Sequence, residues 1–173
     1  MAEQEVVFEE ASPSDAQVFI DFMRQVADET DYLDMSGAEF DLSLEAIKKI
    51  FAANLESVDQ FCLLAKIGSE IIGLVNVKTA QPYRVSHIGN VFIAVKKAYW
   101  GQGIGRILLK EVINWAEFYQ VLGRLELTVQ LRNERAVKLY QSLGFEIEGL
   151  QKRGARTDQG DWLDLYYMGR MVD

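Results

Sequence analysis

Apolar residues recur at intervals of three and four in four stretches of the chain, and this spacing predicts amphipathic helices. Ser12, Pro13 and Asn133 stand where helix caps and first helical residues are expected. Gly123 and Gly144 are placed to end two of these helices. We therefore expect helices over residues 13–28, 43–55, 103–119 and 134–143.

Runs that are continuously apolar, or that alternate apolar and polar residues, predict the strands. Gly68-Ser69 indicates a hairpin turn between two of them. We expect strands over residues 6–8, 60–67, 71–79, 87–95, 124–129, 145–149 and 163–172. The element order predicts one α+β domain over residues 1–173, with a mixed, mostly antiparallel sheet of about seven strands flanked by about four helices.

The composition fits a globular domain and disfavours two classes of partner. Of the 173 residues 49% are hydrophobic, and 18 Lys and Arg against 26 Asp and Glu leave a net charge of −8 at pH 7. That charge repels nucleic acid and favours cationic substrates, although an acidic surface is also a common route to solubility. Apolar runs fall short of the ~20 residues that span a bilayer, and the acidic segment 1–5 lacks signal-peptide features. We expect a cytoplasmic protein with no nucleic-acid or membrane partner.

The one cysteine, Cys62, lies in the apolar run 61–65 and has no second cysteine with which to form a disulfide. No neighbouring His or Cys gives metal-ligand spacing, so we expect a core residue and no metal cofactor.

Three glycines at alternate positions, Gly101, Gly103 and Gly105, join a predicted strand to a predicted helix. Without Cβ atoms they allow backbone N–H groups to converge, and the helix N-terminus adds partial positive charge. The loop is therefore suited to a phosphate or pyrophosphate. A nucleoside-triphosphate loop would need Gly-Lys-Ser/Thr, and the dinucleotide fingerprint would need a third glycine where Arg106 stands. A glycine-rich turn without a ligand is the remaining alternative.

Two blocks of the sequence resemble the GCN5-related N-acetyltransferase (GNAT) superfamily. The glycine loop is similar to the family's Arg/Gln-x-x-Gly-x-Gly/Ala motif, with Gly103 and Gly105 as the final two residues and Trp100 at the first. Trp100 departs from the pattern and removes a polar side chain, which would leave phosphate binding to backbone N–H groups. Residues 133–145 match the family signature Asn-x-x-Ala-x-x-Leu-Tyr-x-x-x-Gly-Phe at every named position. The family-like region runs from 6 to 172, and its tail, 161–168, is loosely similar to the bacterial ribosomal-protein and spermidine acetyltransferases, which does not fix the acceptor.

The resemblance implies that acetyl-CoA is the cosubstrate and that two central parallel strands, ending at Val95 and Val129, splay apart to admit its pantetheine arm. Pantetheine amides would satisfy the backbone groups that the splay leaves unpaired. Asn133 would contact the arm, cap its helix, or do both. The implied cofactor-binding residues are Ile93, Ala94, Val95, Trp100, Gly101, Gln102, Gly103, Ile104, Gly105, Arg106, Asn133, Ala136 and Tyr140.

Tyr140 is the residue whose family position implies a general acid. Acetyl transfer from a thioester to an amine expels a thiolate, which a phenol with a pKa of ~10 can protonate. A packed Tyr that bonds to backbone is the alternative. The base that deprotonates the amine stays open between His87 and Glu126, with Glu29 as a third candidate.

The acidic segment 28–34 falls where family members close over the acceptor. Glu29 and Asp31 could hold a cationic amine there, and Asn90 could orient it. A solvated connection between helices is the alternative interpretation of this segment.

These observations predict an N-acetyltransferase that moves an acetyl group from acetyl-CoA to a primary amine by direct attack. The acceptor would be a small-molecule amine, a polyamine or a protein N-terminus. A non-catalytic acyl-CoA sensor on the same fold is the alternative, and a nucleotide-binding protein is a third. The resemblance also allows a homodimer, with the apolar final strand, 163–172, as its candidate interface.

Overall fold

A seven-stranded mixed sheet runs through the computed structural model, which describes residues 3–173. The sheet order is β1-β2-β3-β4-β5-β7-β6, and the β4–β5 pair is parallel whereas the others are antiparallel. The strands are β1 (Val7–Glu10), β2 (Phe61–Ile67), β3 (Glu70–Thr79), β4 (Ile88–Val95), β5 (Arg124–Gln130), β6 (Glu146–Arg156) and β7 (Trp162–Met171). The α-helices are α1 (Ala16–Glu29), α2 (Leu44–Leu55), α3 (Ile104–Tyr119) and α4 (Glu134–Ser142). This is the predicted α+β architecture; Met1 and Ala2 of the N-terminal segment considered above lie outside the described residues.

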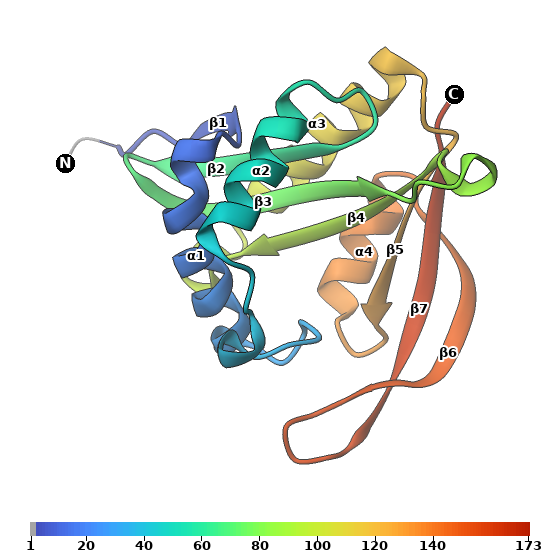
Figure 1. Ribbon diagram of the computed structural model, residues 1–173. Coiled ribbons are helices and arrows are strands. Elements are labelled where there is room, and N and C mark those ends of the chain that lie inside the picture. Colours follow the sequence, from blue (N-terminus) through green and yellow to red (C-terminus); the bar gives the residue numbers. More distant parts are fainter. Residues whose placement is uncertain (1–2) are drawn as a thin grey trace.

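The helices cover the two faces of the sheet in pairs, as Figure 1 shows with α1 and α2 in front and α3 and α4 behind. Alternation along the strands creates one core on each face. In β3, Leu74 packs into the core beneath α1 and α2, whereas Val75 and Val77 pack into the core beneath α3 and α4. Full burial of such a side chain is worth roughly 1.5–3 kcal/mol, so the two cores fix the register of the central strands.

The two parallel strands separate after three residue pairs. Ile88 to Asn90 of β4 pair with Arg124 to Glu126 of β5, and no pairing follows although both strands continue. The strands therefore splay, as the family resemblance implied. The backbone of 91–95 on the β5 side is left facing an opening in the sheet.

Three expectations about element boundaries and one about a helix end need correction. Strand β6 extends to Arg156 rather than ending at Gly149, because it is an exposed edge strand whose polar second half carries no hydrophobic pattern. Residues 13–15 form a 3₁₀ turn, so the first helix, predicted over 13–28, covers 16–29. Strand β1 covers 7–10 instead of 6–8.

The helix predicted over 103–119 does end at Tyr119, but Gly123 is not the residue that ends it. Gln120 already adopts the left-handed conformation, with φ 53°.

The final strand, β7, lies between β5 and β6, so both of its edges are already paired within the chain. A homodimer through this strand would have to use its faces or the neighbouring edge of β6. Dimerisation stays a prediction.

Candidate active site

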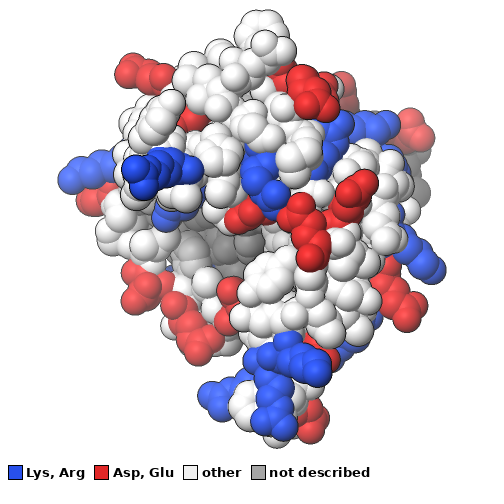
Figure 2. Space-filling model, turned by 90° about the vertical axis from the view of Figure 1, so that its right-hand side faces the viewer, with Lys and Arg blue, Asp and Glu red and all other residues white. Residues whose placement is uncertain are grey.

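The opening between β4 and β5 is the mouth of a cleft of about 1010 Å³. Its walls come from the diverging ends of both strands, the start of α3, one side of α4 and the segment after α1. Figure 2 shows the surface hollowed on this side of the molecule, with charged side chains around the hollow. The volume suits a cofactor-sized ligand, which a shallow surface depression would not hold.

The glycine loop forms one end of the cleft. Gly101 and Gly103 have φ values of 79° and 81°, a region that other residues rarely adopt, and α3 begins immediately afterwards at Ile104. A Cβ on Gly103 would meet no atom within 4 Å, so the space beside it is open. The loop therefore presents backbone at a helix start to an empty concavity, as an anion site requires.

Trp100 stands where the family motif has a polar residue, and its indole is used in contacts within the protein. Its Nε1 donates a hydrogen bond to the Val95 carbonyl at 2.8 Å, and its ring stacks on Tyr32 with centroids 6.3 Å apart. The carbonyl that ends β4 is thus already satisfied within the chain. Trp100 braces the loop that holds the glycines.

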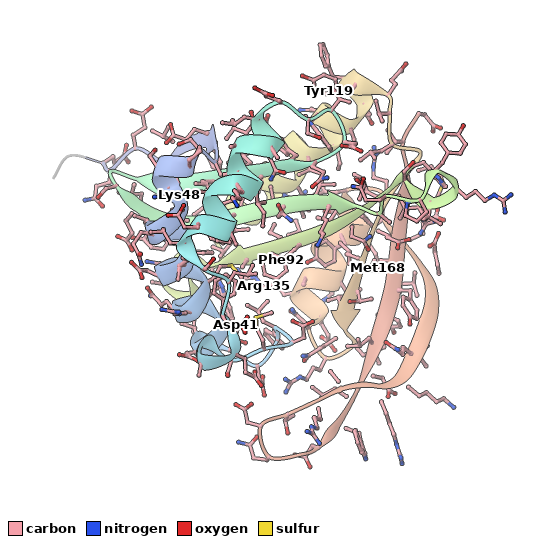
Figure 3. All side chains as sticks on the ribbon, viewed as in Figure 1. Asp41, Lys48, Phe92, Tyr119, Arg135 and Met168 are labelled. Carbon is pink, nitrogen blue, oxygen red and sulfur yellow. The ribbon has the colours of Figure 1, made fainter. Side chains whose placement is uncertain are left out.

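Arg135 is a cleft residue that the sequence analysis missed. It lies on the first turn of α4 and lines the cleft, and a Cβ on Gly101 would stand only 2.8 Å from its Nη2 atom. Figure 3 labels its side chain beside α4. A guanidinium therefore lies against the glycine loop, where the sequence had suggested backbone N–H groups alone. The sequence does contain a signal for this role, because Arg135 is a cation two residues after Asn133, in the helix that packs beside the loop.

Tyr140 is buried at the other end of α4, with 7% of its surface exposed, and lines the cleft. Its ring packs against Phe145 at 5.9 Å. Within residues 3–173 no hydrogen bond involves its hydroxyl. The alternative of a packed Tyr that bonds to backbone is therefore not supported. Burial raises the pKa of Tyr140 to about 12, which keeps the hydroxyl protonated at neutral pH.

Asn133 is the N-cap of α4. Its Oδ1 accepts the Ala136 backbone N–H at 3.4 Å, and the residue also lines the cleft. The predicted cofactor residues converge on the same space: all of them line the cleft except Gln102, which is exposed beside it.

The predicted bases lie outside the cleft. His87 is exposed just before β4, whereas the glycine loop follows that strand, so about 25 Å of extended chain separate them. Its ring lies beside Gly123, at 3.4 Å from the position of a Cβ there. Glu126 pairs with Asn90 in the last register position before the splay, and its carboxylate accepts a hydrogen bond from Arg124 Nε at 3.1 Å.

The predicted acceptor carboxylates are occupied by other groups. Glu29 accepts the Lys97 backbone N–H at 2.7 Å, and Asp31 forms an ion pair with Arg132 at 2.6 Å. Neither these two nor Asn90 lines the cleft. Among the described residues, Asp34 is the only carboxylate that does.

Residues 3–173 contain no group of three or more His, Cys, Asp or Glu side chains placed to hold a metal ion. No helix in the same range is both long and apolar enough to cross a membrane.

A sheet opened between two parallel strands, with a glycine loop at one end of the opening and a buried phenol at the other, is the arrangement expected of an acetyltransferase. The sequence model of the Acetyltransferase (GNAT) family matches residues 23–145. The chain belongs to that family, and the enzyme class predicted from its sequence, an acetyl-CoA-dependent N-acetyltransferase, is confirmed.

Two curated relatives match similar shares of the chain. L-amino acid N-acetyltransferase AaaT of Escherichia coli is 34% identical over 63% of this chain and 67% of its own length. N-alpha-acetyltransferase RimI of Mycobacterium tuberculosis is 32% identical over 64% of this chain and 68% of its own.

Two solved structures have the same fold. A GNAT-family acetyltransferase of Streptococcus pneumoniae superposes with a TM-score of 0.94 at 42% identity, over 97% of this chain and all of that one. The acetyltransferase yncA of Salmonella typhimurium, described with its cofactor acetyl-CoA, superposes with a TM-score of 0.83 over 98% of this chain and 95% of its own. At 17% identity this second likeness shows the fold alone.

Proposed function

We propose that the protein transfers the acetyl group of acetyl-CoA to a primary amine by direct attack, with Tyr140 as general acid. The observation that carries the proposal is the meeting of the glycine loop and the Tyr140 hydroxyl in one cleft. A protein that only binds acyl-CoA needs the glycine loop but does not need a proton donor at the other end of the cleft. The cleft thus favours the enzyme over the acyl-CoA sensor.

The cleft fits acetyl-CoA by the chemistry of its walls. Backbone N–H groups of the glycine loop and the Arg135 guanidinium offer donors to a pyrophosphate. The unpaired stretch of β4, 91–95, offers backbone partners to the pantetheine amides, although the Val95 carbonyl is taken by Trp100. Asn133 remains available to contact the pantetheine arm with its free amide hydrogens.

Tyr140 would deliver its proton to the departing thiolate. Its burial keeps that proton in place, and a neutral phenol also costs less to bury than a charged acid would. Because the predicted bases His87 and Glu126 lie outside the cleft, we propose that the ammonium loses its proton to water before the free amine attacks.

We propose an α-amine as the acceptor, on a small molecule or at the start of a peptide. Both curated relatives carry names of this kind, one for L-amino acids and one for N-alpha acetylation. The net charge of −8 also favours a cationic acceptor over an anionic one.

The test is thiol release from acetyl-CoA in the presence of amino acids, short peptides and polyamines, beside thermal shifts with acetyl-CoA, ATP and NAD. We expect stabilisation by acetyl-CoA alone and turnover with at least one α-amine. Stabilisation with no turnover on any amine would support the sensor, and stabilisation by ATP or NAD would support a nucleotide-binding protein.

Replacing Arg135 by Gln should weaken acetyl-CoA binding. The variant loses a charge-assisted contact at an exposed site, so we expect the Kd to rise roughly fivefold to tenfold, with a shallower dependence on salt. Calorimetric titration at two ionic strengths measures both effects. Arg84→Gln, which removes an exposed arginine outside the cleft, is the control and should bind as the wild type does. Equal affinities for the two variants would remove Arg135 from the cofactor site.

The pH profile of turnover should rise and then stay level. The rising limb reflects deprotonation of the acceptor amine, whose neutral form attacks. A falling limb requires loss of the Tyr140 proton, and burial raises that pKa to about 12, so none is expected below about pH 10. Initial rates from about pH 6 to pH 10 measure the profile. A decline starting near pH 8 would point to an acid other than Tyr140.

A further inference from the structure

The segment 30–36, here called the strap, connects α1 to a short turn at Gly37–Glu39 and forms one wall of the cleft. Both of its ends are fixed. At one end the Glu29 carboxylate accepts the Lys97 N–H, and at the other Asp28 Oδ1 accepts the Gly37 N–H at 2.7 Å. A Cβ on Gly37 would lie 2.5 Å from the Arg24 carbonyl oxygen, so that turn is closely packed.

Between its ends the strap is held to the opposite half of the sheet by Asp31, Gln130 and Arg132, here called the clasp. Arg132 Nη2 donates to Asp31 Oδ1 at 2.6 Å, and Gln130 Nε2 donates to the Asp31 carbonyl at 2.8 Å. Arg132 Nε also donates to Gln130 Oε1 at 2.8 Å. Gln130 is buried, with 5% exposed, and its amide uses both its nitrogen and its oxygen in these contacts.

Aromatic contacts extend the clasp to the glycine loop. The Arg132 guanidinium lies 5.3 Å from the centre of the Tyr32 ring, and Tyr32 stacks on Trp100. Trp100 directly precedes Gly101. A continuous set of contacts therefore runs from the cofactor loop, across the strap, to the end of β5.

The strap lies on the side from which an acceptor must come. Leu127 and Val129 of β5 pack into the core beneath α3 and α4, the side that carries the glycine loop. Gln130, by the alternation of the strand, faces the other side, together with the strap that it binds. If the cofactor binds along the glycine loop on the first side, as proposed above, the acceptor reaches the thioester from the second side, past the strap.

We propose that the clasp holds the strap across the acceptor entrance, and that Arg132 thereby sets the size of amine that the enzyme accepts. The inference rests on the proposed function. A closed clasp favours free amino acids, because the strap leaves little width for a chain that continues beyond the first residue. Arg132 is a positioning residue: it acts on the strap and touches neither the thioester nor Tyr140.

Hydrogen exchange of the strap tests the clasp without any turnover. Both partners of the ion pair are more than a third exposed, so Arg132→Gln should speed exchange of the strap amides on the order of fivefold. The swapped pair Asp31→Arg with Arg132→Asp should return exchange toward the wild-type rate. Arg84→Gln is the control and should leave strap exchange unchanged. Unaltered exchange in Arg132→Gln would overturn the proposal.

The acceptor profile tests what the clasp does. For wild type, Arg132→Gln and the swapped pair, kcat/KM is measured with free amino acids and with tripeptides of the same first residue. We expect the tripeptide-to-amino-acid ratio to rise at least fivefold in Arg132→Gln and to fall back in the swapped pair. An unchanged ratio with faster exchange overturns the clasp as a size filter and leaves the proposed function standing. No thiol release by wild type or variant, or exchange of 101–105 that acetyl-CoA does not slow, overturns the proposed function and the size filter with it.

Discussion

Replacing Tyr140 by Phe should lower kcat about a hundredfold while the Kd for acetyl-CoA changes by less than about twofold. The ring is retained, so the contact with Phe145 and the packing of α4 should persist. General acid catalysis is worth roughly 10²–10⁴ in rate. We expect the lower end, because thiolate is a fair leaving group and because a pKa raised to about 12 makes the phenol a weaker donor. Single-turnover thiol release and calorimetric titration separate the two quantities.

The matched control is Tyr119→Phe, at the exposed end of α3 (Figure 3). This variant also loses a tyrosine hydroxyl, but one that lies outside the cleft. It should retain wild-type turnover. The Tyr140→Phe loss should appear in kcat and kcat/KM together, since the proton moves only in the transition state. Wild-type rates for Tyr140→Phe between about pH 6 and pH 10 would mean that the hydroxyl only packs.

The fold was predictable because its core follows short-range patterns. The alternation in β3 and the cap Asn133 each act within a few residues, and the structure contains this cap as a hydrogen-bonded N-cap. The second half of β6 was not predictable, because an exposed edge strand buries no regular apolar stripe. The residue that ends α3 was not predictable either. Gln120 adopts the left-handed conformation there, although this conformation is usually taken by glycine, and Gly123 was therefore expected to end the helix.

The cofactor side of the cleft was more predictable than the acceptor side. Gly103, Asn133 and Tyr140 belong to local motifs, and the fold brings all of them to one cavity. The acceptor side depends on pairs far apart in sequence, such as Asp31 with Arg132, for which a single sequence carries no pattern. His87 was proposed as a base because it is close in sequence to β4, but the two ends of a strand lie at opposite ends of the sheet, and the cleft is at the other end.

Gly103→Val should remove most of the stabilisation that acetyl-CoA gives to the folded protein. A Cβ branch would occupy the open space where phosphate oxygens approach the backbone, and the φ of 81° would be strained as well. Losing one or two charge-assisted hydrogen bonds raises the Kd on the order of a hundredfold. At a concentration about 100 times the wild-type Kd, binding stabilises the native state by about 2.7 kcal/mol, and a hundredfold weaker Kd leaves about 0.4 kcal/mol.

Gly160→Val separates this loss from strain. Gly160 lies in the β6–β7 turn outside the cleft, with φ 89° and no atom within 4 Å of an added Cβ, so its backbone cost should be similar. Both variants should melt a few degrees lower than wild type without ligand, since 1 kcal/mol corresponds to roughly 2–4 °C at this size. Only Gly160→Val should regain the full acetyl-CoA shift in differential scanning fluorimetry. An equal shift in the two variants would mean that the cofactor's phosphates do not rest on the glycine loop.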